Sequence, residues 1–306
     1  MSVMLCNEPE CRKETAPTVA LSVEGRTREL GDGFTVRRLL PSAARRMVGP
    51  FIFVDHMGPI RLPPNHGLDV RPHPHINLAT VTFLFEGEIL HRDSLGSEQP
   101  IRPGDVNWML AGRGIVHSER TPSAARMSGP SLHGMQLWVA LPKVEEEAVP
   151  SFQHHPSRTI PSVDRPGAQL RIIAGSAYGQ TSPVRVSSPL FYVEANLDAG
   201  TTLPLPDEQE RAAYVVSGAV SADGKTYGEG VMVVFREGSR AGVHALEASR
   251  VLLLGGAPLE GERHIWWNFV SSSRERIERA KDDWRHGRFA KVPGDETDFI
   301  PLPDST

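Results

Sequence analysis

Short apolar stretches alternate with clusters of turn residues along most of the chain. The apolar stretches are rich in β-branched and aromatic residues, which favour strands. They predict strands at Val19–Val23, Thr35–Leu40, Pro50–Met57, Thr80–Phe85 and Leu137–Leu141. Glycine, proline and aspartate stand between such stretches, as in Pro103-Gly104-Asp105, and these residues favour turns. The pattern therefore predicts an all-β protein built from short strands.

The second half of the chain repeats the first faintly. Ala212–Ser217, followed by Gly218, resembles Val81–Glu86, followed by Gly87. With 306 residues, the chain is long enough for two domains that each bury a core of their own. We therefore expect two β-barrels in tandem.

Helical periodicity is strongest near the C-terminus. Ser272 and Glu275 have the spacing of a capping box, which satisfies the first backbone N–H groups of a helix. Apolar residues then recur at helical spacing at Ile277, Ala280 and Trp284. His286 and Gly287 supply a C-terminal stop. We expect one amphipathic helix whose apolar face packs against the rest of the protein.

Composition places the boundaries between these parts. Several prolines in Pro150–Pro166 mark the predicted crossing between the barrels. The predicted organisation is a first barrel at 17–150, a second barrel at 151–265, and a helix with an extended arm at 266–306. Residues 1–16 are charged and lack periodicity, which predicts a disordered lead-in.

The bulk composition excludes several classes of protein. Hydrophobic residues make up 39% and charged residues 23%, as in soluble globular proteins. The net charge of −4 gives no electrostatic footprint for direct nucleic-acid binding. No apolar run has membrane length and no secretory leader is apparent, so no membrane partner is expected. The two cysteines, Cys6 and Cys11, are expected to be free thiols, because a metal clip there would lack further ligands. A reducing, cytoplasmic location is the default expectation.

Several polar residues beside the predicted strands have ordinary explanations. His56 follows Asp55 at a strand end and is expected to tie down a turn. His91 and Asp93 alternate in a way that allows either face of a strand. Lys143–Glu147 is a short charged run, and such runs usually form a solvated face.

The candidate chemistry lies in two pairs, His73-x-His75 and His117-x-Glu119. Side chains at i and i+2 of a strand point to the same face, so the two side chains of each pair point in the same direction. The histidines of a single pair of this kind often form only hydrogen bonds and bind no metal. Two pairs on adjacent strands can instead converge as four metal ligands. The segment Arg61–Pro74, rich in proline and glycine, is expected to be a loop leading into this site.

The spacing around these pairs resembles the first cupin motif, with Gly67, His73, His75 and Gly87 in place. Thr80 stands where that motif carries glutamate, and Glu119 can supply the missing acid. This arrangement resembles the pirin family over almost the whole chain. The segments that carry the resemblance are FVDHMGP at 53–59, HPH at 73–75, LHRDSLG at 90–96, PGDVNWMLAGRGIVHSER at 103–120, LHGMQLWVALP at 132–142, LLLGGAPL at 252–259 and RHIWWNFVSSSRERIERAKDDWRHGRF at 263–289. Many pirins read H-P-H-x-G-F-E, whereas this chain continues from His75 with INLA, so the substrate preference of the family does not transfer.

The resemblance implies two tandem cupin, jelly-roll-like barrels, with the C-terminal helix packed back on the N-terminal barrel. It also implies iron(II) bound by His73, His75, His117 and Glu119. Affinity order alone does not select iron, because zinc, copper, nickel and manganese are alternatives, and a closed set of four ligands also suits structural zinc. The implied activity is that of a dioxygenase that acts with dioxygen on a small aromatic chelator of the quercetin type. The alternative is a metal-binding regulatory protein that acts through an unidentified protein partner.

Two further expectations concern the site. Glu119 is either the general base that accepts a substrate proton or a plain fourth ligand. Aligning Gly218 with Gly87 places Pro204 and Pro206 where His73 and His75 stand, so the second barrel is expected to lack a metal. Possible lining residues of the cavity are Phe53, Phe83, Phe85, Trp108, Met109 and Met135, most of which serve equally well as barrel core.

Overall fold

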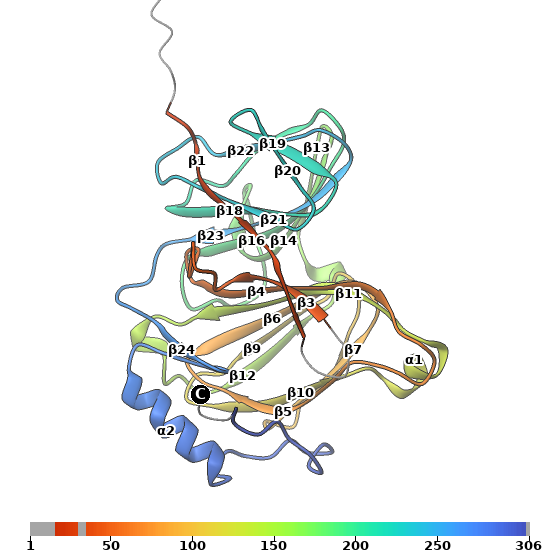
Figure 1. Ribbon diagram of the computed structural model, residues 1–306, viewed down its shortest axis with the longest axis vertical. Coiled ribbons are helices and arrows are strands. Elements are labelled where there is room, and N and C mark those ends of the chain that lie inside the picture. Colours follow the sequence, from red (N-terminus) through yellow and green to blue (C-terminus); the bar gives the residue numbers. More distant parts are fainter. Residues whose placement is uncertain (1–15, 30–34, 304–306) are drawn as a thin grey trace, which may run out of the picture.

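The computed structural model describes residues 16–29 and 35–303, so the expectations for Cys6 and Cys11 and for nearly all of the lead-in lie outside it. The described residues form two β-rich lobes, stacked along the long axis of the molecule (Figure 1). Each lobe consists of one large and one small antiparallel sheet. The predicted all-β fold of two tandem cupin barrels is confirmed.

The first barrel contains the candidate ligands. Its larger sheet has the spatial order β12 (Ser151–His155), β9 (Val106–Leu110), β6 (Leu78–Glu86), β11 (Ser131–Ala140), β4 (Phe51–Arg61), β3 (Thr35–Leu40) and β2 (Arg26–Glu29). Its smaller sheet has the order β5 (Asp69–His75), β10 (Ile115–Arg120), β7 (Ile89–Asp93) and β8 (Glu98–Ile101). The helix α1 (Ser123–Ser128) and the short 3-10 turns η1 (Lys143–Glu145) and η2 (Ser157–Thr159) lie in connections.

The second barrel repeats this design. Its larger sheet has the order β1 (Val19–Glu24), β21 (Val231–Phe235), β18 (Glu210–Ser217), β23 (Ser249–Gly256), β16 (Leu190–Leu197), β14 (Ala168–Ala177) and β13 (Ser162–Arg165), with β15 (Gln180–Thr181) on β14. Its smaller sheet has the order β17 (Thr202–Pro204), β22 (Gly242–Ala245), β19 (Ala219–Ala222) and β20 (Lys225–Gly228). A hairpin of β24 (His264–Trp266) and β25 (Phe269–Ser271) follows, before the helix α2 (Arg274–Arg285).

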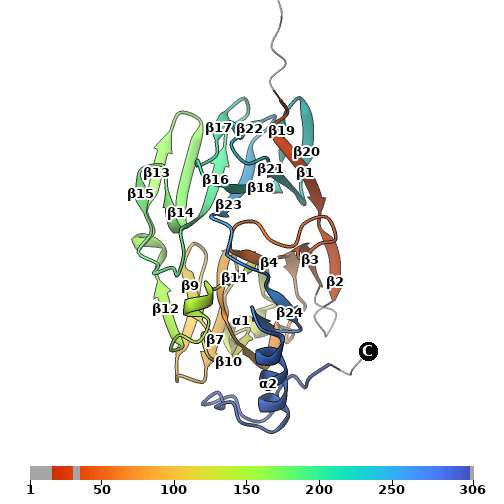
Figure 2. The same cartoon turned by 90° about the vertical axis from the view of Figure 1, so that its left-hand side faces the viewer.

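Two strands pair across the domain boundaries predicted from the sequence. The first described strand, β1, pairs with β21 of the second barrel, as Figure 2 shows at the edge of the upper lobe. Conversely, β12 follows residue 150, in the part of the chain predicted to form the second barrel, and it pairs with β9 of the first barrel. Each barrel therefore gains an edge strand from beyond the predicted boundary, and this strand pairing holds the two halves together.

A shared hydrophobic core lies between the barrels. Side chains alternate along β6. Thr80 and Thr82 point into the first barrel, so Val81 and Phe83 point toward the second barrel. Side chains from both barrels form one cluster, which includes Leu137 and Met135 from β11 together with Tyr192, Tyr214 and Leu252. Burial of each such large side chain contributes roughly 1.5–3 kcal/mol. The larger sheet of each barrel is therefore covered on both faces.

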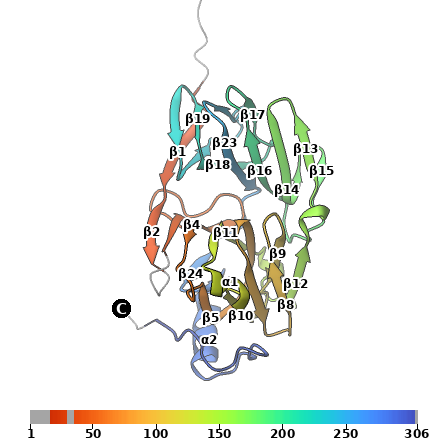
Figure 3. The same cartoon turned by 90° about the vertical axis from the view of Figure 1, so that its right-hand side faces the viewer.

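The C-terminal helix packs on the first barrel, as expected. In Figure 3, α2 lies beneath the lower lobe, next to the smaller sheet. The buried face of the helix presents Ile277 and Ala280 to Ile76 and Phe269, with Trp284 partly buried beside them. None of the described helices is both long and apolar enough to cross a membrane.

The predicted start of this helix is wrong by one residue. The N-cap is Ser273, whose side chain accepts a hydrogen bond from the backbone N–H of Arg276 at 3.1 Å. Ser272 instead donates its hydroxyl to a carboxylate oxygen of Glu146 at 2.9 Å. Ser272, which the local spacing favours as the cap, thus forms a tertiary contact instead of capping the helix.

Lys143–Glu147 is largely exposed, as expected for a solvated face, and Glu146 is the exception. Glu146 is buried, and its carboxylate accepts the backbone N–H of Ser272 at 2.9 Å and lies 3.1 Å from Nε of the buried Arg263. Burial of a charge is costly unless it is paired and hydrogen-bonded, and here it is both. Glu146 therefore fastens the C-terminal segment to the first barrel.

Candidate metal centre

Three of the four predicted ligands converge inside the first barrel. His73 and His75 lie on β5, and His117 on the adjacent strand β10 stands directly opposite His73. One ligand atom from each of the three side chains lies within 4.8 Å of the other two. All three are buried. The strand begins earlier than expected, at Asp69, so the predicted loop Arg61–Pro74 is confined to the residues between β4 and β5.

The hydrogen bonds of these histidines leave nitrogen lone pairs available. Nδ1 of His73 donates to the backbone carbonyl of Arg71 at 2.8 Å, and Nδ1 of His75 donates to that of Asn268 at 3.0 Å. Since a carbonyl only accepts, both Nδ1 atoms carry the proton and both Nε2 atoms keep a lone pair. Both ring nitrogens of His117 are buried and have no hydrogen-bond partner among the described residues. This arrangement fits a bound metal ion.

Electrostatics keeps the three imidazoles neutral. Burial lowers the pKa of His73 to about 4. Burial, together with repulsion from neighbouring histidines, lowers the pKa values of His75 and His117 well below their usual range. Only a neutral imidazole offers a lone pair to a metal, so at neutral pH the three side chains are ready to bind one.

Glu119 lies near this cluster but outside it. It follows His117 on β10, with an irregularity in the pairing with β5 between the two, and its carboxylate is not part of the set within 4.8 Å. It is buried, and its Oε1 lies 3.2 Å from Oγ1 of Thr82, whose hydroxyl is closer to Oε1 of Gln136, at 2.8 Å. Burial raises the pKa of its carboxyl group. Its roles as fourth ligand and as base both stay predictions.

A cavity of about 760 Å³ opens onto the histidines. Both sheets contribute to its lining, and so does the C-terminal segment. The lining includes Arg38, Phe53, Asp55, Met57, Arg71, His73, His75, Glu119, Gln136, Trp138, Trp267, Asn268 and Ile300. The volume is within the range of small-molecule sites, so an aromatic compound can reach the imidazoles.

The sequence alone does not predict that the C-terminal segment contributes to the site. Asn268 orients the ring of His75, and Trp267 beside it adopts φ +52°, a left-handed conformation that is uncommon for a bulky residue. Ile300 reaches the cavity because its backbone N–H binds the carbonyl of Pro72 at 2.9 Å. No local spacing connects these residues with His73, which lies 194 to 227 positions earlier in the sequence, so only the folded chain brings them together.

The structure divides the six aromatic and methionine residues proposed as lining. Phe53 lines the cavity, and Met109 belongs to the apolar cluster beside it. Phe83, Trp108 and Met135 lie in the core between the barrels, where Phe85 packs against them. Strand alternation decides this outcome, since these residues occupy the outward positions of β6, β9 and β11. Trp138, which the sequence prediction missed, stacks on Phe53 with ring centroids 4.0 Å apart.

Two other histidines have defined positions. His91 and Asp93 face the barrel interior, with Nε2 of His91 3.1 Å from the carboxylate of Asp93 and the His91 ring centroid 5.3 Å from that of His117. The expectation that His56 ties down a turn is wrong. His56 is buried within β4 between the barrels, with Nδ1 2.6 Å from the hydroxyl of Tyr214 and Nε2 2.8 Å from Nε2 of His133.

The second barrel has no equivalent cluster among its described residues. Its strand β22 places His244 opposite Thr202, as β10 places His117 opposite His73. The counterparts of His73 and His75 are therefore Thr202 and Pro204, and the predicted alignment on Pro204 and Pro206 is shifted by two residues. Nδ1 of His244 is 2.9 Å from the hydroxyl of Thr202, so a hydrogen bond replaces the chelate.

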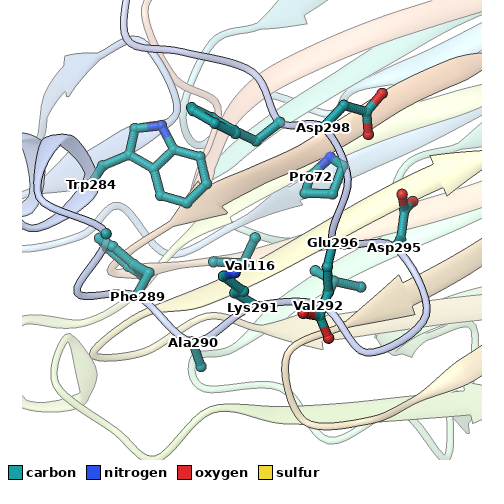
Figure 4. Close-up of a pocket in the computed structure, with 12 residues that line it drawn as sticks. Pro72, Val116, Trp284, Phe289, Ala290, Lys291, Val292, Asp295, Glu296 and Asp298 are labelled. Atoms are coloured by element: carbon teal, nitrogen blue, oxygen red, sulfur yellow. The ribbon is translucent and has the colours of Figure 1, made fainter.

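A smaller cavity of about 150 Å³ lies behind the metal centre (Figure 4). Pro72 and Val116 form part of its wall, and they alternate along their strands with His73 and His117, so this cavity lies on the outer face of the sheet. The remaining walls come from α2 and the arm that follows it, including Trp284 and Phe289. Two of its carboxylates, Asp295 and Asp298, bind Arg120 at 2.6–2.8 Å. The cavity thus marks the docking of the arm.

Comparisons with known proteins agree with this architecture. The family model of pirin matches residues 33–139, and the model of the pirin C-terminal cupin domain matches residues 192–290. A pirin-like protein of Caulobacter vibrioides is 51% identical over 290 residues, which cover 94% of this chain and 100% of that protein.

Solved structures extend the likeness to the fold. A quercetin 2,3-dioxygenase from Acinetobacter baumannii superposes with a TM-score of 0.86 at 36% identity, covering 94% of this chain and 96% of that chain. Another quercetin 2,3-dioxygenase structure from the same organism gives a TM-score of 0.83 at 29% identity, with 90% and 99% covered. The chain therefore belongs to the pirin family, with the two-barrel cupin architecture of these relatives.

Proposed function

We propose that this protein is an iron(II)-dependent dioxygenase of flavonol-type aromatic chelators. The observation that carries the proposal is a cluster of three neutral, buried imidazoles, two of which, His73 and His75, line a cavity of about 760 Å³. A structural metal site is closed by its protein ligands, whereas a catalytic one keeps access for substrate. The likeness to a quercetin 2,3-dioxygenase at 36% identity supports the choice of substrate class.

The chain would hold the metal through Nε2 of His73, Nε2 of His75 and a ring nitrogen of His117, with Glu119 either as a plain fourth ligand or as the base described below. A bound divalent iron would supply redox chemistry toward dioxygen and would lower the pKa of a hydroxyl group that chelates it. Asn268 and Arg71 would keep the two β5 imidazoles in the required tautomer through their carbonyl oxygens.

Glu119 is the proposed acceptor of the substrate's hydroxyl proton. Its carboxylate is buried on the wall of the same cavity, within reach of a substrate bound there. Burial raises the pKa of this carboxyl group, and a base works best when its pKa approaches the operating pH. Its Oε1 lies 3.2 Å from Oγ1 of Thr82.

The apolar part of the wall would position the aromatic rings and exclude water. Phe53 and Trp138 stack on each other there, and the Trp138 ring stands edge-on to His75, with centroids 5.0 Å apart. Trp267 and Ile300 add apolar surface from the C-terminal segment. A planar substrate can therefore be held beside the metal site by apolar contact.

The proposal is tested by oxygen uptake. Protein reconstituted anaerobically with iron(II) is mixed with a panel of flavonols, and dissolved oxygen is followed with an electrode while the products are identified by mass spectrometry. We expect uptake with incorporation of both oxygen atoms into the product, and none with a His75→Ala variant under the same conditions. Absence of uptake with every flavonol would overturn the proposal and favour the regulatory role.

A further inference from the structure

The inner face of the larger sheet of the first barrel carries one polar row. Arg38 stands opposite Asp55, Asp55 opposite Gln136, and Gln136 opposite Thr82. Paired residues in an antiparallel sheet share a face, so these four side chains from β3, β4, β11 and β6 line up across the sheet. We call them the polar row.

Apolar rows flank the polar row on both sides. Phe53 pairs with Trp138 on the side nearer His75, and Val36 pairs with Met57 on the other. These flanking residues belong to two separate hydrophobic clusters in the barrel interior. The polar row is therefore a narrow polar strip between two apolar rows of this sheet.

Stability alone does not account for this strip. Asp55 is only 2% exposed, and desolvating a charge costs free energy that its partner offsets only in part. Apolar residues of similar volume often serve as well or better at such positions. Three members, Arg38, Asp55 and Gln136, line the cavity that also contains His73 and His75. The polar row thus faces the metal site across the cavity.

Two donor groups of the polar row, one on Arg38 and one on Gln136, have no hydrogen-bond acceptor among the described residues. Arg38 binds Asp55 through Nε and Nη2 at 2.9 and 2.8 Å, which leaves Nη1 without a hydrogen bond to a described residue. Gln136 accepts the hydroxyl of Thr82 through Oε1 at 2.8 Å, and its Nε2 likewise makes no hydrogen bond with a described residue. Both side chains are held in fixed orientations by the bonds they do make. Preorganised donors of this kind are suited to recognising a ligand oxygen.

We propose that Gln136 is a specificity-determining residue that donates Nε2–H to an oxygen substituent on the substrate rings, with Arg38 as a second donor. The inference rests on the proposed function and narrows its substrate class to flavonols that carry ring hydroxyl groups beyond the chelating 3-hydroxy-4-oxo unit. Phe53 and Trp138 contact the faces or edges of the substrate rings, and the polar row donates hydrogen bonds to the oxygen substituents at the edge of those rings. A bare flavonol satisfies the metal site but leaves these donors unpaired, which costs binding free energy.

The test measures binding without turnover. The protein is loaded with zinc(II), which is redox-inert, and titrated with quercetin or with 3-hydroxyflavone, which has the same chelating unit but no other hydroxyl group. Dissociation constants come from quenching of tryptophan fluorescence, with calorimetry as a check. We expect Gln136→Met to weaken quercetin binding by roughly three- to tenfold, as the loss of one buried hydrogen bond implies. The affinity for 3-hydroxyflavone should not fall, because this compound has no hydroxyl group that pairs with Gln136.

Two further variants sharpen this comparison. Gln136→Glu keeps the acceptor for Thr82 but removes both amide donors, so it should lose the same preference even if Gln136→Met folds poorly. Gln169→Met replaces an exposed strand glutamine of the second barrel and should bind both compounds like the wild type. Zinc content of each variant is measured beforehand.

The outcomes separate the inference from the proposed function. If the wild type binds both flavonols but the Gln136 variants keep its full preference, or if the wild type has none, the inference is overturned and the proposed function stands. If zinc-loaded wild type binds neither compound, the flavonol-based function and the inference are overturned together.

Discussion

At the scale of single residues, His117 is the side chain that most needs an explanation. Both of its ring nitrogens are buried without a hydrogen-bond partner among the described residues. An unsatisfied buried polar group costs about 1–3 kcal/mol, so an ordinary core position would not retain an imidazole in this state. A metal ion bound by His117, His73 and His75 would reduce the cost, since it would take the lone pair of one His117 ring nitrogen that no protein donor reaches.

This reasoning predicts the effect of removing one ligand. His117→Ala should lose most bound metal after dialysis, because the two remaining imidazoles form a weaker and wetter site, while the wild type retains one ion per chain. His244→Ala is the matched control, since His244 occupies the equivalent register position in the second barrel and binds only Thr202 there. Metal analysis by mass spectrometry of the dialysed proteins checks both. Full occupancy in His117→Ala, or two ions in the wild type, would contradict the assignment.

Glu119 allows the roles of base and ligand to be separated. Glu119→Gln keeps the shape of the side chain and its contact with Thr82, but an amide does not accept a proton at neutral pH. If Glu119 is the base, the variant should retain much of its iron and lose roughly 10²-fold or more in turnover. Iron content and oxygen uptake are measured on the same preparation. Turnover at the wild-type rate would remove Glu119 from the base role, and a parallel loss of iron would favour the plain ligand.

At the scale of elements, the C-terminal segment completes a site that the strands alone leave open. Asn268 in the turn between β24 and β25 orients His75, and the arm after α2 reaches the cavity with Ile300. Two anchors hold this segment on the first barrel. Glu146 binds Ser272 and Arg263, and Arg120 binds Asp295 and Asp298. The segment is thus part of the metal centre as well as a covering of the barrel.

Loss of the first anchor should therefore affect both stability and metal binding. Glu146→Ala leaves Arg263 buried without its carboxylate, and breaking a buried ion pair in this way costs about 3–5 kcal/mol. We expect that loss in the free energy of unfolding, together with weaker metal binding as Asn268 becomes less well placed against His75. Denaturant unfolding and metal titration measure the two effects. Glu145→Ala, at the exposed neighbouring position, should change neither.

At the scale of the whole molecule, the two barrels form one cooperative body. The hydrophobic cluster between them draws on both larger sheets, and β1 and β12 each pair with the other half. A chain of polar contacts also crosses this interface, from His133 through His56 to Tyr214. Because the interface is a buried core, the barrels should unfold together in one transition.

The histidines at this interface predict how stability depends on pH. Burial is the largest cause that lowers the pKa of His56, to about 3, from 6.5. Between these values the unfolded chain binds a proton that the folded protein excludes, so the stability is fully present above pH 6.5 and falls as the pH drops through this window. One such histidine contributes a slope of at most about 1.4 kcal/mol per pH unit. His56→Gln should have a shallower slope than the wild type in metal-free denaturant titrations at several pH values, and equal slopes would contradict the prediction.

The sequence by itself determined what local backbone geometry dictates. Strands and turns followed from residue types, and the period of two along a strand already placed His73 and His75 on one face. The helix near Ile277 followed from its own spacing, because the contacts that form a helix are local. The resemblance carried by the quoted motifs added the cupin type of the two predicted barrels.

Only the tertiary structure decided which strands meet and in what register. The opposition of His117 to His73, the displacement of Glu119 by an irregularity in pairing, and the exchange of β1 and β12 all depend on contacts between distant segments. Such pairings are selected by the summed burial of many side chains, so no single stretch encodes them. The same holds for Asn268 behind His75, for Ser272 bound to Glu146 in place of capping the helix, and for the polar row. Each is assembled from residues that are unremarkable alone and gain a role only when the whole core has closed around them.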